Sequence, residues 1–482
     1  MGGERQFVAP RTGLLLQGPI LPVLLRLAVP NLLLIFVQHL VGLIEMFWVS
    51  RLGTDTLAGV SLVFPVLSLM QMMSAGAVGG GISSAVARAI GGGQAQMTSI
   101  LVHHALAISL AFGIAFSAVF VGWGPSIYHL MGGDGVSLQS ALAYSNMVFG
   151  GIALLWVSNS MASLLRGAGN VTYPAVIICS GAVVLAATSP LLIFGVGPFP
   201  RLGVAGAGLA IDLYYAVSAL LLGARLISGR ELVRLELRWP AFRFGLFFHI
   251  LRVGVVSAVI GLSTTLTIAL TNAVLGMAGP TMLAGFGVGV RLEYVIISIT
   301  FGFGIPVVAM VGTCIGAGDI RRARRVAWTA AAIGAAVAEA VGLAAAAWPG
   351  SWLGLFTHDA KVIAAGTLYL RSVSPIYGFL GLGMLLYFAS QGAGRMGWPA
   401  AAAVMRLTVA ALGAWWSFHR GPDSVASAYL ALAASFIVFG GVNAWAMRTW
   451  PGRPADGPKN KNHRDLAGPL EPQAKWEVTS SP

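Results

Sequence analysis

Long apolar runs follow one another along almost the whole chain, separated by short polar or glycine-rich breaks. A run of about 20 apolar residues is long enough to cross the hydrocarbon core of a bilayer as an α-helix. Dividing the chain on this basis predicts twelve membrane-spanning helices. Their predicted ranges are 24–49, 57–85, 99–122, 138–164, 173–195, 203–227, 247–275, 281–314, 326–348, 363–391, 398–418 and 424–447. The pattern therefore predicts an all-α integral membrane protein.

The second half of the chain repeats the first. AIGGGQ at 89–94 corresponds to CIGAGD at 314–319, so Gly91 maps to Gly316 at a separation of 225 positions. Pro174 maps to Pro399 at the same separation. Because each copy holds six spans, an even number, both copies enter the membrane in the same direction. The chain is therefore predicted to form two six-helix lobes related by a parallel pseudo-two-fold axis, an arrangement found in secondary transporters.

The breaks between the apolar runs divide the chain into five parts. These are an N-terminal segment at 1–23, an N-terminal lobe at 24–227, a linker at 228–246, a C-terminal lobe at 247–450 and a tail at 451–482. The tail is rich in proline and charged residues, so we expect it to be disordered. The chain has no G-x-x-x-x-G-K-[ST] motif, which favours an ion gradient over nucleotide hydrolysis as the energy source.

Composition adds information mainly through the placement of charge. The 482 residues are 57% hydrophobic and 9% charged, with a formal net charge of +13. When Lys and Arg are assigned to alternate sides of the twelve spans, 23 fall on the side of the termini and linker and 4 on the other. The positive-inside rule then predicts that both termini are cytoplasmic. A basic total of this origin does not indicate nucleic-acid binding, and the two cysteines and eight histidines show no metal-ligand spacing.

The first span carries a polar stripe. Asn31, Gln38 and Glu45 are seven residues apart, which places them on one helix face, and such a face is costly against lipid. An ionisable residue within a span is a functional candidate. The matching position in the second half is Thr271, so the packing of the repeat does not require an acid. If Glu45 is enclosed, its neutral form is favoured and it can load and release a proton; the alternative is that it reaches water or pairs with Arg51.

Several short motifs, in order along 24–447, resemble the multidrug and toxic compound extrusion (MATE) family. They are LAVPNLL at 27–33, IEMFWVSRLGTDTLAGVSL at 44–62, SSAVARAIGGG at 83–93, LLRGAGN at 164–170, LGVAGAGLA at 202–210 and MVGTCIGAGDIRRARR at 310–325. Each motif alone is weak, and their order and spacing carry the resemblance. The resemblance implies twelve helices in two lobes and the export of organic, often cationic, compounds in exchange for H⁺ or Na⁺.

The resemblance also gives Glu45 a role. Glu45 falls where many bacterial members carry an aspartate that titrates, and one branch pairs that aspartate with a second one just before a proline in the fifth helix. Here Ser189 precedes Pro190, so the partner carboxylate is missing. Asp212 in the sixth span is the candidate replacement, with a structural buried acid as the alternative. The expected polar network of the substrate cavity consists of Asn31, Gln38, Asn159 and Ser189, and the alternative for Asn31 and Gln38 is that they form hydrogen bonds between helices.

Four of the charged residues within the predicted spans of the second lobe are candidates for an ion site or a structural pair: Arg291, Glu293, Glu339 and Arg371. An arginine at this depth is costly unless it is paired or faces water. We expect a structural ion pair, with Glu293 and Arg371 as the candidate partners, and an ion site is the alternative. Family members that bind Na⁺ in this lobe use an acid in the seventh span, but 247–275 has none. H⁺ is therefore favoured over Na⁺ as the coupling ion.

These observations predict a secondary antiporter that exports organic, cationic or amphipathic compounds in exchange for H⁺ by rocking of the two lobes. One alternative is a flippase for a lipid-linked precursor. Another is an integral-membrane transferase, but such an enzyme needs clustered His or acidic residues at one interface, and the acids here are scattered singly. We expect a multi-pass inner-membrane monomer that is not an enzyme. Its expected partners are the bilayer and a small-molecule substrate, with no nucleic acid and no cofactor besides the coupling ion.

Overall fold

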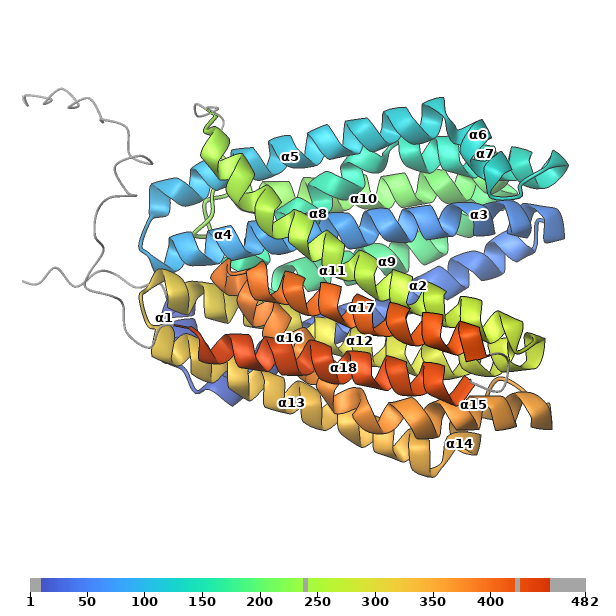
Figure 1. Ribbon diagram of the computed structural model, residues 1–482. Helices are drawn as coiled ribbons and strands as arrows, with labels where there is room; N and C mark the ends of the chain where they lie inside the picture. The colour runs from blue at the N-terminus through green and yellow to red at the C-terminus, as the bar shows by residue number, and fades with distance from the viewer. Residues whose placement is uncertain (1–9, 237–241, 421–424, 451–482) are drawn as a thin grey trace, which may run out of the picture.

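Two bundles of α-helices lie side by side in the computed structural model, which describes residues 10–236, 242–420 and 425–450 (Figure 1). Every regular element within these residues is a helix. Eleven helical stretches are long and apolar enough to cross a membrane, and a bent pair of helices makes a twelfth. The predicted all-α architecture with twelve spans in two lobes is confirmed.

The N-terminal lobe (N-lobe) contains the first six spans. Its elements are α2 (Ile20–Ser50), α3 (Thr54–Gln71) continued through the π-helical turn η1 (Met72–Val78) into α4 (Gly79–Gly91), α5 (Ala95–Gly122), the short α6 (Gly124–Leu130), α7 (Gly135–Gly150), α8 (Ile152–Gly167), α9 (Thr172–Phe194) and α10 (Val204–Ile227). A short helix, α1 (Pro10–Gln17), precedes them. The span predicted as 138–164 is two helices, because α7 and α8 meet at the Gly150–Gly151 pair with a bend of 47°.

The C-terminal lobe (C-lobe) contains the other six spans. Its elements are α11 (Phe244–Met277), α12 (Pro280–Gly316), α13 (Ile320–Ala347), the short α14 (Pro349–Leu353), α15 (Ala360–Val373), the 3₁₀ turn η2 (Ser374–Ile376), α16 (Tyr377–Ala393), α17 (Gly397–Arg420) and α18 (Val425–Arg448). The span predicted as 363–391 is interrupted at η2. Pro375 stands in this turn, and a proline removes a backbone donor that a continuous helix would use.

The helix boundaries themselves repeat at 225 positions. The pairs of first residues are Ala95 and Ile320 (α5 and α13), Gly135 and Ala360 (α7 and α15), Ile152 and Tyr377 (α8 and α16), and Thr172 and Gly397 (α9 and α17). The sequence repeat therefore corresponds to a structural repeat, element by element.

A contact between α4 and α12 marks the pseudo-two-fold axis. A Cβ atom on Gly91 would lie 2.1 Å from the Thr313 carbonyl oxygen, and one on Gly316 would lie 2.1 Å from the Arg88 carbonyl oxygen. Gly91 matches Gly316 in the repeat, and Arg88 matches Thr313, so the contact is reciprocal, as a two-fold axis requires. Only glycine lets the two backbones approach this closely. The two lobes are closed against each other at this end of the bundle.

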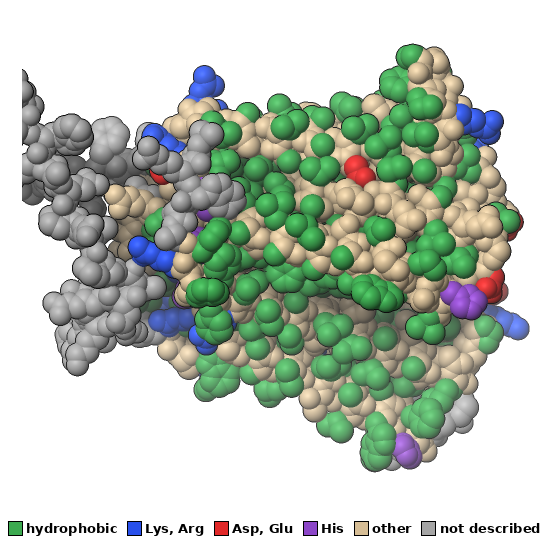
Figure 2. Space-filling view, turned by 90° about the horizontal axis from the view of Figure 1, so that it is seen from above, with side chains coloured by type: hydrophobic (Ala, Val, Ile, Leu, Met, Phe, Trp, Pro, Cys, Tyr) green, Lys and Arg blue, Asp and Glu red, His purple; other side chains and the backbone are tan. Residues whose placement is uncertain are grey.

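We call this the linker end, since the linker that follows α10 and the α4–α5 and α12–α13 connections all lie there, on the left in Figure 1. The far end carries the α2–α3 turn, α6 and α14. Figure 2 shows Lys and Arg side chains gathered at the two ends, with a mainly hydrophobic and uncharged band between them. Such a band suits the hydrocarbon core of a bilayer.

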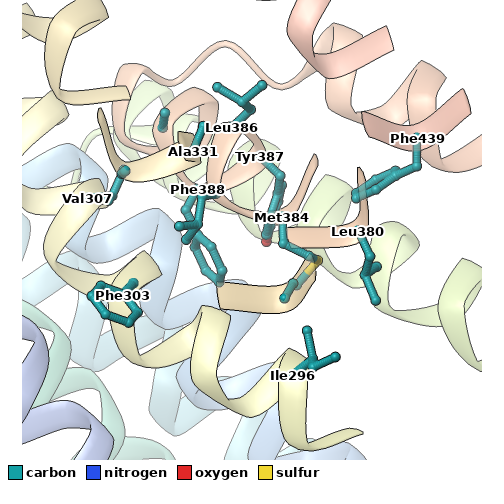
Figure 3. Packing of buried hydrophobic residues seen from close by; sticks show 14 of the residues in the cluster. Ile296, Phe303, Val307, Ala331, Leu380, Met384, Leu386, Tyr387, Phe388 and Phe439 are labelled. Carbon is teal, nitrogen blue, oxygen red and sulfur yellow. The ribbon is translucent and has the colours of Figure 1, made fainter. Parts of the chain in front are cut away.

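Each lobe has its own hydrophobic core, and α2 contributes to both. In the C-lobe, Ile296 and Phe303 of α12 pack with Met384 and Phe388 of α16 (Figure 3). The first half of α2 joins this C-lobe core through residues including Leu24 and Ala28. Its second half, including Leu34 and Val41, belongs to the N-lobe core. Pro30 lies between the two halves.

Candidate functional site

Glu45 is half-buried in the N-lobe. Its Oε1 atom is buried and has no hydrogen-bond partner, and its carboxylate interacts with the hydroxyl of Tyr144, a buried residue of α7. Arg51 instead lies over the Phe47 ring, 4.9 Å from its centroid. No ion pair joins Arg51 to Glu45 within the described residues. The alternative that Arg51 neutralises Glu45 is therefore wrong.

Asp212 of α10 lies against the break between α7 and α8. A Cβ atom on Gly151 would come within 2.3 Å of the Asp212 Cγ atom, so glycine at this position makes room for the carboxylate. The carboxylate thus sits beside the first turn of α8, which begins at Ile152. The unpaired N–H groups at a helix N-terminus favour a negative charge.

Two tyrosines lie within electrostatic range of both acids. The Tyr144 hydroxyl interacts electrostatically with Glu45, Asp212 and Tyr215. The Tyr215 hydroxyl interacts with both Glu45 and Asp212. Glu45 and Asp212, which the sequence places in the first and sixth predicted spans, therefore share one pair of tyrosines inside the N-lobe.

Hydrogen bonds extend this group to the middle of the second span. The Tyr215 hydroxyl donates to Gln71 Oε1 at 3.1 Å, and the Asn159 amide donates to the same oxygen at 3.4 Å and to Ser74 Oγ at 2.7 Å. Ser74 belongs to the π-helical turn η1, and such turns are frequent at functional sites. We call Glu45, Gln71, Tyr144, Asp212 and Tyr215 the N-lobe cluster.

The π-helical turn also contacts the other lobe. A Cβ atom on Gly254 of α11 would lie 3.3 Å from the Ala77 carbonyl oxygen, and one on Gly261 would meet the Met72 side chain at 2.5 Å. From the other side, Gln391 of α16 donates to the Gly76 carbonyl oxygen at 3.4 Å. The N-lobe cluster is therefore connected, through Asn159 and η1, to the interface between the lobes.

The other polar residues predicted for the cavity take different positions. Asn159 belongs to the network just described, and Gln38 is half-buried. Asn31 is fully buried and donates to the Leu27 carbonyl oxygen of its own helix at 3.4 Å. Ser189 is also buried, and its hydroxyl has no hydrogen-bond partner among the described residues. A role for these residues in substrate binding stays a prediction.

The C-lobe holds a buried ion pair, but with a partner different from the one predicted. Glu293 and Arg406 are 0% and 2% exposed, and their side chains approach to 3.5 Å. The Tyr369 hydroxyl donates to Glu293 at 3.5 Å. Arg371 is exposed, so the predicted pairing of Glu293 with Arg371 is wrong. Arg406 lies nine residues inside α17, about 13 Å along the helix axis from its start.

The other two predicted charges, Arg291 and Glu339, have separate partners. Arg291 is exposed and lies over the Phe356 ring, 5.0 Å from its centroid. Glu339 accepts the backbone N–H of Gly378 at 2.7 Å and so caps the start of α16, immediately after η2. The four predicted charges therefore do not form one ion site. No group of three or more His, Cys, Asp or Glu residues stands close enough to hold a metal ion in the part of the chain that the structure describes.

The repeat allows a direct comparison of the buried acids. Tyr144 and Tyr369 are repeat equivalents, and each interacts with a glutamate: Tyr144 with the half-buried Glu45, and Tyr369 with the fully buried Glu293. Arg406 compensates the charge of Glu293. Among the described residues, no cation is paired with Glu45 or Asp212. An enclosed carboxylate without a cation becomes neutral most readily by binding a proton.

Sequence reasoning found both acids of the N-lobe cluster but not their partners. Gln71, Tyr144 and Tyr215 are ordinary residues of apolar helices, and nothing in their spacing distinguishes them. Two features of the sequence mark this region. Tyr144 aligns with Tyr369 in the repeat, and the Gly150–Gly151 pair stands inside a predicted span.

Comparison with known proteins is consistent with this architecture. The MatE family model matches residues 30–191 and 257–416, once in each lobe. A protein of Shewanella oneidensis named "FAD transporter" is 30% identical over 319 residues, covering 64% of this chain and 69% of that protein. A Thermotoga maritima protein named "Probable multidrug resistance protein NorM" is 23% identical over 378 residues, covering 77% and 80%.

Solved structures show the same fold. A crystal structure of MATE in the bent conformation gives a TM-score of 0.83 at 23% identity, covering 92% of this chain and 97% of that one. An outward-facing multidrug resistance MATE transporter gives 0.78 at 24% identity, covering 90% and 96%. The family model covers most of both lobes, and the chain therefore belongs to the MatE family of membrane transporters, the multidrug and toxic compound extrusion (MATE) family.

Proposed function

We propose that this protein exports organic compounds in exchange for protons, and that Glu45 and Asp212 are the groups that bind the coupling proton. The observation that carries the proposal is the contrast between the lobes. Glu293 has Arg406 beside it, whereas Glu45 and Asp212 share two tyrosines and, among the described residues, no cation. The N-lobe acids are therefore the ones whose charge can change during a transport cycle.

Protonation of Glu45 would act through α2. A buried carboxylate needs water or polar partners around it, whereas a neutral carboxyl group tolerates a tighter, drier environment. The two halves of α2 pack in different cores and Pro30 separates them. A change in packing around Glu45 would therefore alter how α2 sits between the lobes. Loss of the negative charge would also release a bound cation.

Rocking of the lobes would complete the cycle. In this structure the linker end is closed by the reciprocal contact of Gly91 and Gly316 with the facing backbones. At the far end, the outer helix α3 packs against α7, η1 and α2 of its own lobe. Access from the linker side requires separation of α4 from α12. We place the linker end in the cytoplasm of a cell with an inner membrane, because the Lys and Arg residues are concentrated on that side.

The names of the relatives indicate the general class of substrate. One relative is named for FAD, an anionic aromatic dinucleotide, and several are named for multidrug resistance. We propose an aromatic organic substrate, and FAD and a lipophilic cation such as ethidium are suitable probes for its two possible charge types.

Transport by the purified protein in liposomes tests the proposal. An imposed pH gradient is expected to drive accumulation of FAD or ethidium, and a Na⁺ gradient at constant pH is expected not to. Glu45→Gln should insert normally and lose proton-driven transport, while Glu45→Asp keeps part of it. Asp55→Asn, at an exposed acid in the first turn of α3, is the matched control and should transport normally.

Two other outcomes would replace the proposal. Unimpaired pH-driven transport by Glu45→Gln would remove the coupling role of this residue. Scrambling of lipids without transport of either solute would instead favour a flippase for a lipid-linked precursor.

A further inference from the structure

The short helix α1 lies at the linker end, where it contacts both lobes. Leu15 is 3% exposed and Thr12 is 7% exposed, so α1 is packed against the protein rather than projecting from it. Leu15 belongs to the buried core that contains Cys314 of α12, and its side chain also packs beside Gly169 in the α8–α9 connection. The remaining contacts of α1 divide between the two lobes.

Glu231 in the linker attaches α1 to the N-lobe. Its side chain is 3% exposed. It accepts hydrogen bonds from Arg11 of α1 at 2.7 Å, from Arg225 at the end of α10 at 2.9 Å, and from the Asn170 amide at 2.9 Å. A buried carboxylate with several charge-assisted bonds is a strong and directional anchor.

Arg322 of α13 attaches the same segment to the C-lobe. Its guanidinium donates to the Leu15 carbonyl oxygen at 3.2 Å and also to the Gly18 carbonyl oxygen. Gly18 lies between α1 and α2, and the first half of α2 packs in the C-lobe core. Residues 11–18 are therefore held by Glu231 on one lobe and by Arg322 on the other.

We propose that α1 is a strap that holds the linker ends of the two lobes together, and that Glu231 is the residue that positions it. This inference rests on the proposed rocking of the lobes. If α4 separates from α12, Glu231 and Asn170 move with the N-lobe while Arg322 moves with the C-lobe. The strap cannot keep both attachments, so one of them must break in each cycle.

The attachment to Glu231 is the one that breaks. The side chain of Arg11 is 48% exposed, so water can replace Glu231 as its partner. Arg225 and Asn170 stay with Glu231 and continue to compensate its buried charge. The bonds from Arg322, by contrast, hold a segment that continues into α2, whose first half is buried in the C-lobe core. The strap therefore travels with the C-lobe, and the strength of the Arg11–Glu231 pair sets how often the linker end opens.

The native Cys314 reports on this opening. It is 0% exposed and lies one residue from Thr313 and two from Gly316, which form the α4–α12 contact. The only other cysteine of the chain is Cys179. In a Cys179→Ser background, the rate of Cys314 alkylation by a membrane-permeant maleimide in native membranes measures exposure of the linker end.

Arg11→Ala should raise the alkylation rate of Cys314 about three- to tenfold, the effect expected for the net contribution of one typical hydrogen bond, since Arg11 is half exposed to water. Glu231→Gln should act in the same direction, and Arg11→Lys should restore most of the protection. Arg230→Ala is the matched control, since it removes an exposed arginine next to Glu231 and should leave the rate unchanged. Thermal unfolding of each variant separates opening from general destabilisation, because Arg11→Ala should leave the midpoint near that of Arg230→Ala.

Equal alkylation rates in Arg11→Ala and Arg230→Ala would overturn the strap. The strap would also be overturned if Arg11→Ala raised the Cys314 alkylation rate while lowering the unfolding midpoint, and Arg11→Lys did not restore the protection. Failure of the proposed function gives a different result: neither FAD nor ethidium would be transported by the wild-type protein, whatever the alkylation rates are.

Discussion

The half-buried Glu45 of α2 and the fully buried Glu293 of α12 differ in whether a cation is paired with them. Both contact a tyrosine at the same position of the repeat, but only Glu293 has an arginine beside it. A paired carboxylate stays charged and stabilises the fold only as long as its partner remains. An unpaired, enclosed carboxylate can exchange a proton. The difference between a structural acid and a coupling acid in this protein is therefore set at the scale of a single side chain.

Removing Arg406 should destabilise the C-lobe. Arg406→Leu leaves Glu293 buried without its cation, and breaking a buried pair in this way costs about 3–5 kcal/mol. Thermal unfolding in detergent should show a large drop in the midpoint, and the double variant Arg406→Leu/Glu293→Leu should recover part of it. Arg371→Leu, at an exposed arginine, should have little effect. A midpoint for Arg406→Leu as high as that of Arg371→Leu would show that the pair contributes little.

Gly151 should be essential for the position of Asp212. In Gly151→Ala, the new methyl group would lie 2.3 Å from the Asp212 Cγ atom, so the carboxylate must leave the start of α8. We expect a loss of about 1–3 kcal/mol in stability and strongly reduced proton-driven transport. Gly150→Ala is the neighbouring control, because nothing lies within 4 Å of its Cβ position. Equal transport by the two variants would exclude a role for the Asp212 position.

At the scale of elements, the apolar pattern predicted each span, because the bilayer allows few structures besides long apolar helices. It did not predict the break at Gly151, the π-helical turn η1 or the helix α1. These features depend on contacts between segments far apart in the chain, such as Gly151 with Asp212 and Arg11 with Glu231. The sequence shows which polar residues lie within the apolar runs, but it does not show which residues they contact. The choice of Arg371 for Glu293 failed for this reason.

The contact of α4 with α12 should be equally sensitive to substitution from either lobe. Gly91→Ala and Gly316→Ala would each place a methyl group 2.1 Å from a facing carbonyl oxygen, so the linker end could not close. Both variants should increase alkylation of Cys314 to a similar extent and reduce transport. Gly92→Ala, whose Cβ would meet its nearest neighbour at 3.4 Å, should leave the linker end closed. Protection of Cys314 in Gly91→Ala would contradict the closed-end contact.

At the scale of the whole molecule, the fold is a symmetric pair of lobes with asymmetric chemistry. Helix boundaries and the Gly91 and Gly316 contacts follow the repeat, whereas the buried charges do not. The symmetry provides two similar bodies that can rock about a shared axis. Protonation of the N-lobe acids would change the charge of the N-lobe during this motion. The charge of the C-lobe would stay the same, because Glu293 is paired with Arg406.

The orientation in the membrane is a separate prediction at this scale. The Lys and Arg distribution predicts that both termini and the linker end are cytoplasmic. A reporter enzyme that is active only in the periplasm should be silent when fused after Val478. The same reporter inserted between Gly132 and Gly133, at the far end, should be active. The opposite pair of results would invert the proposed direction of transport.

Proton release on substrate binding tests the central claim most directly. In weakly buffered detergent solution near neutral pH, the wild-type protein should release protons when it binds a cationic substrate such as ethidium, because a bound cation favours the charged carboxylates of Glu45 and Asp212. Glu45→Gln/Asp212→Asn should release almost no protons at saturating ethidium, and Asp55→Asn should release as many as the wild type. Undiminished proton release from Glu45→Gln/Asp212→Asn would contradict the account and place the coupling proton outside the N-lobe cluster.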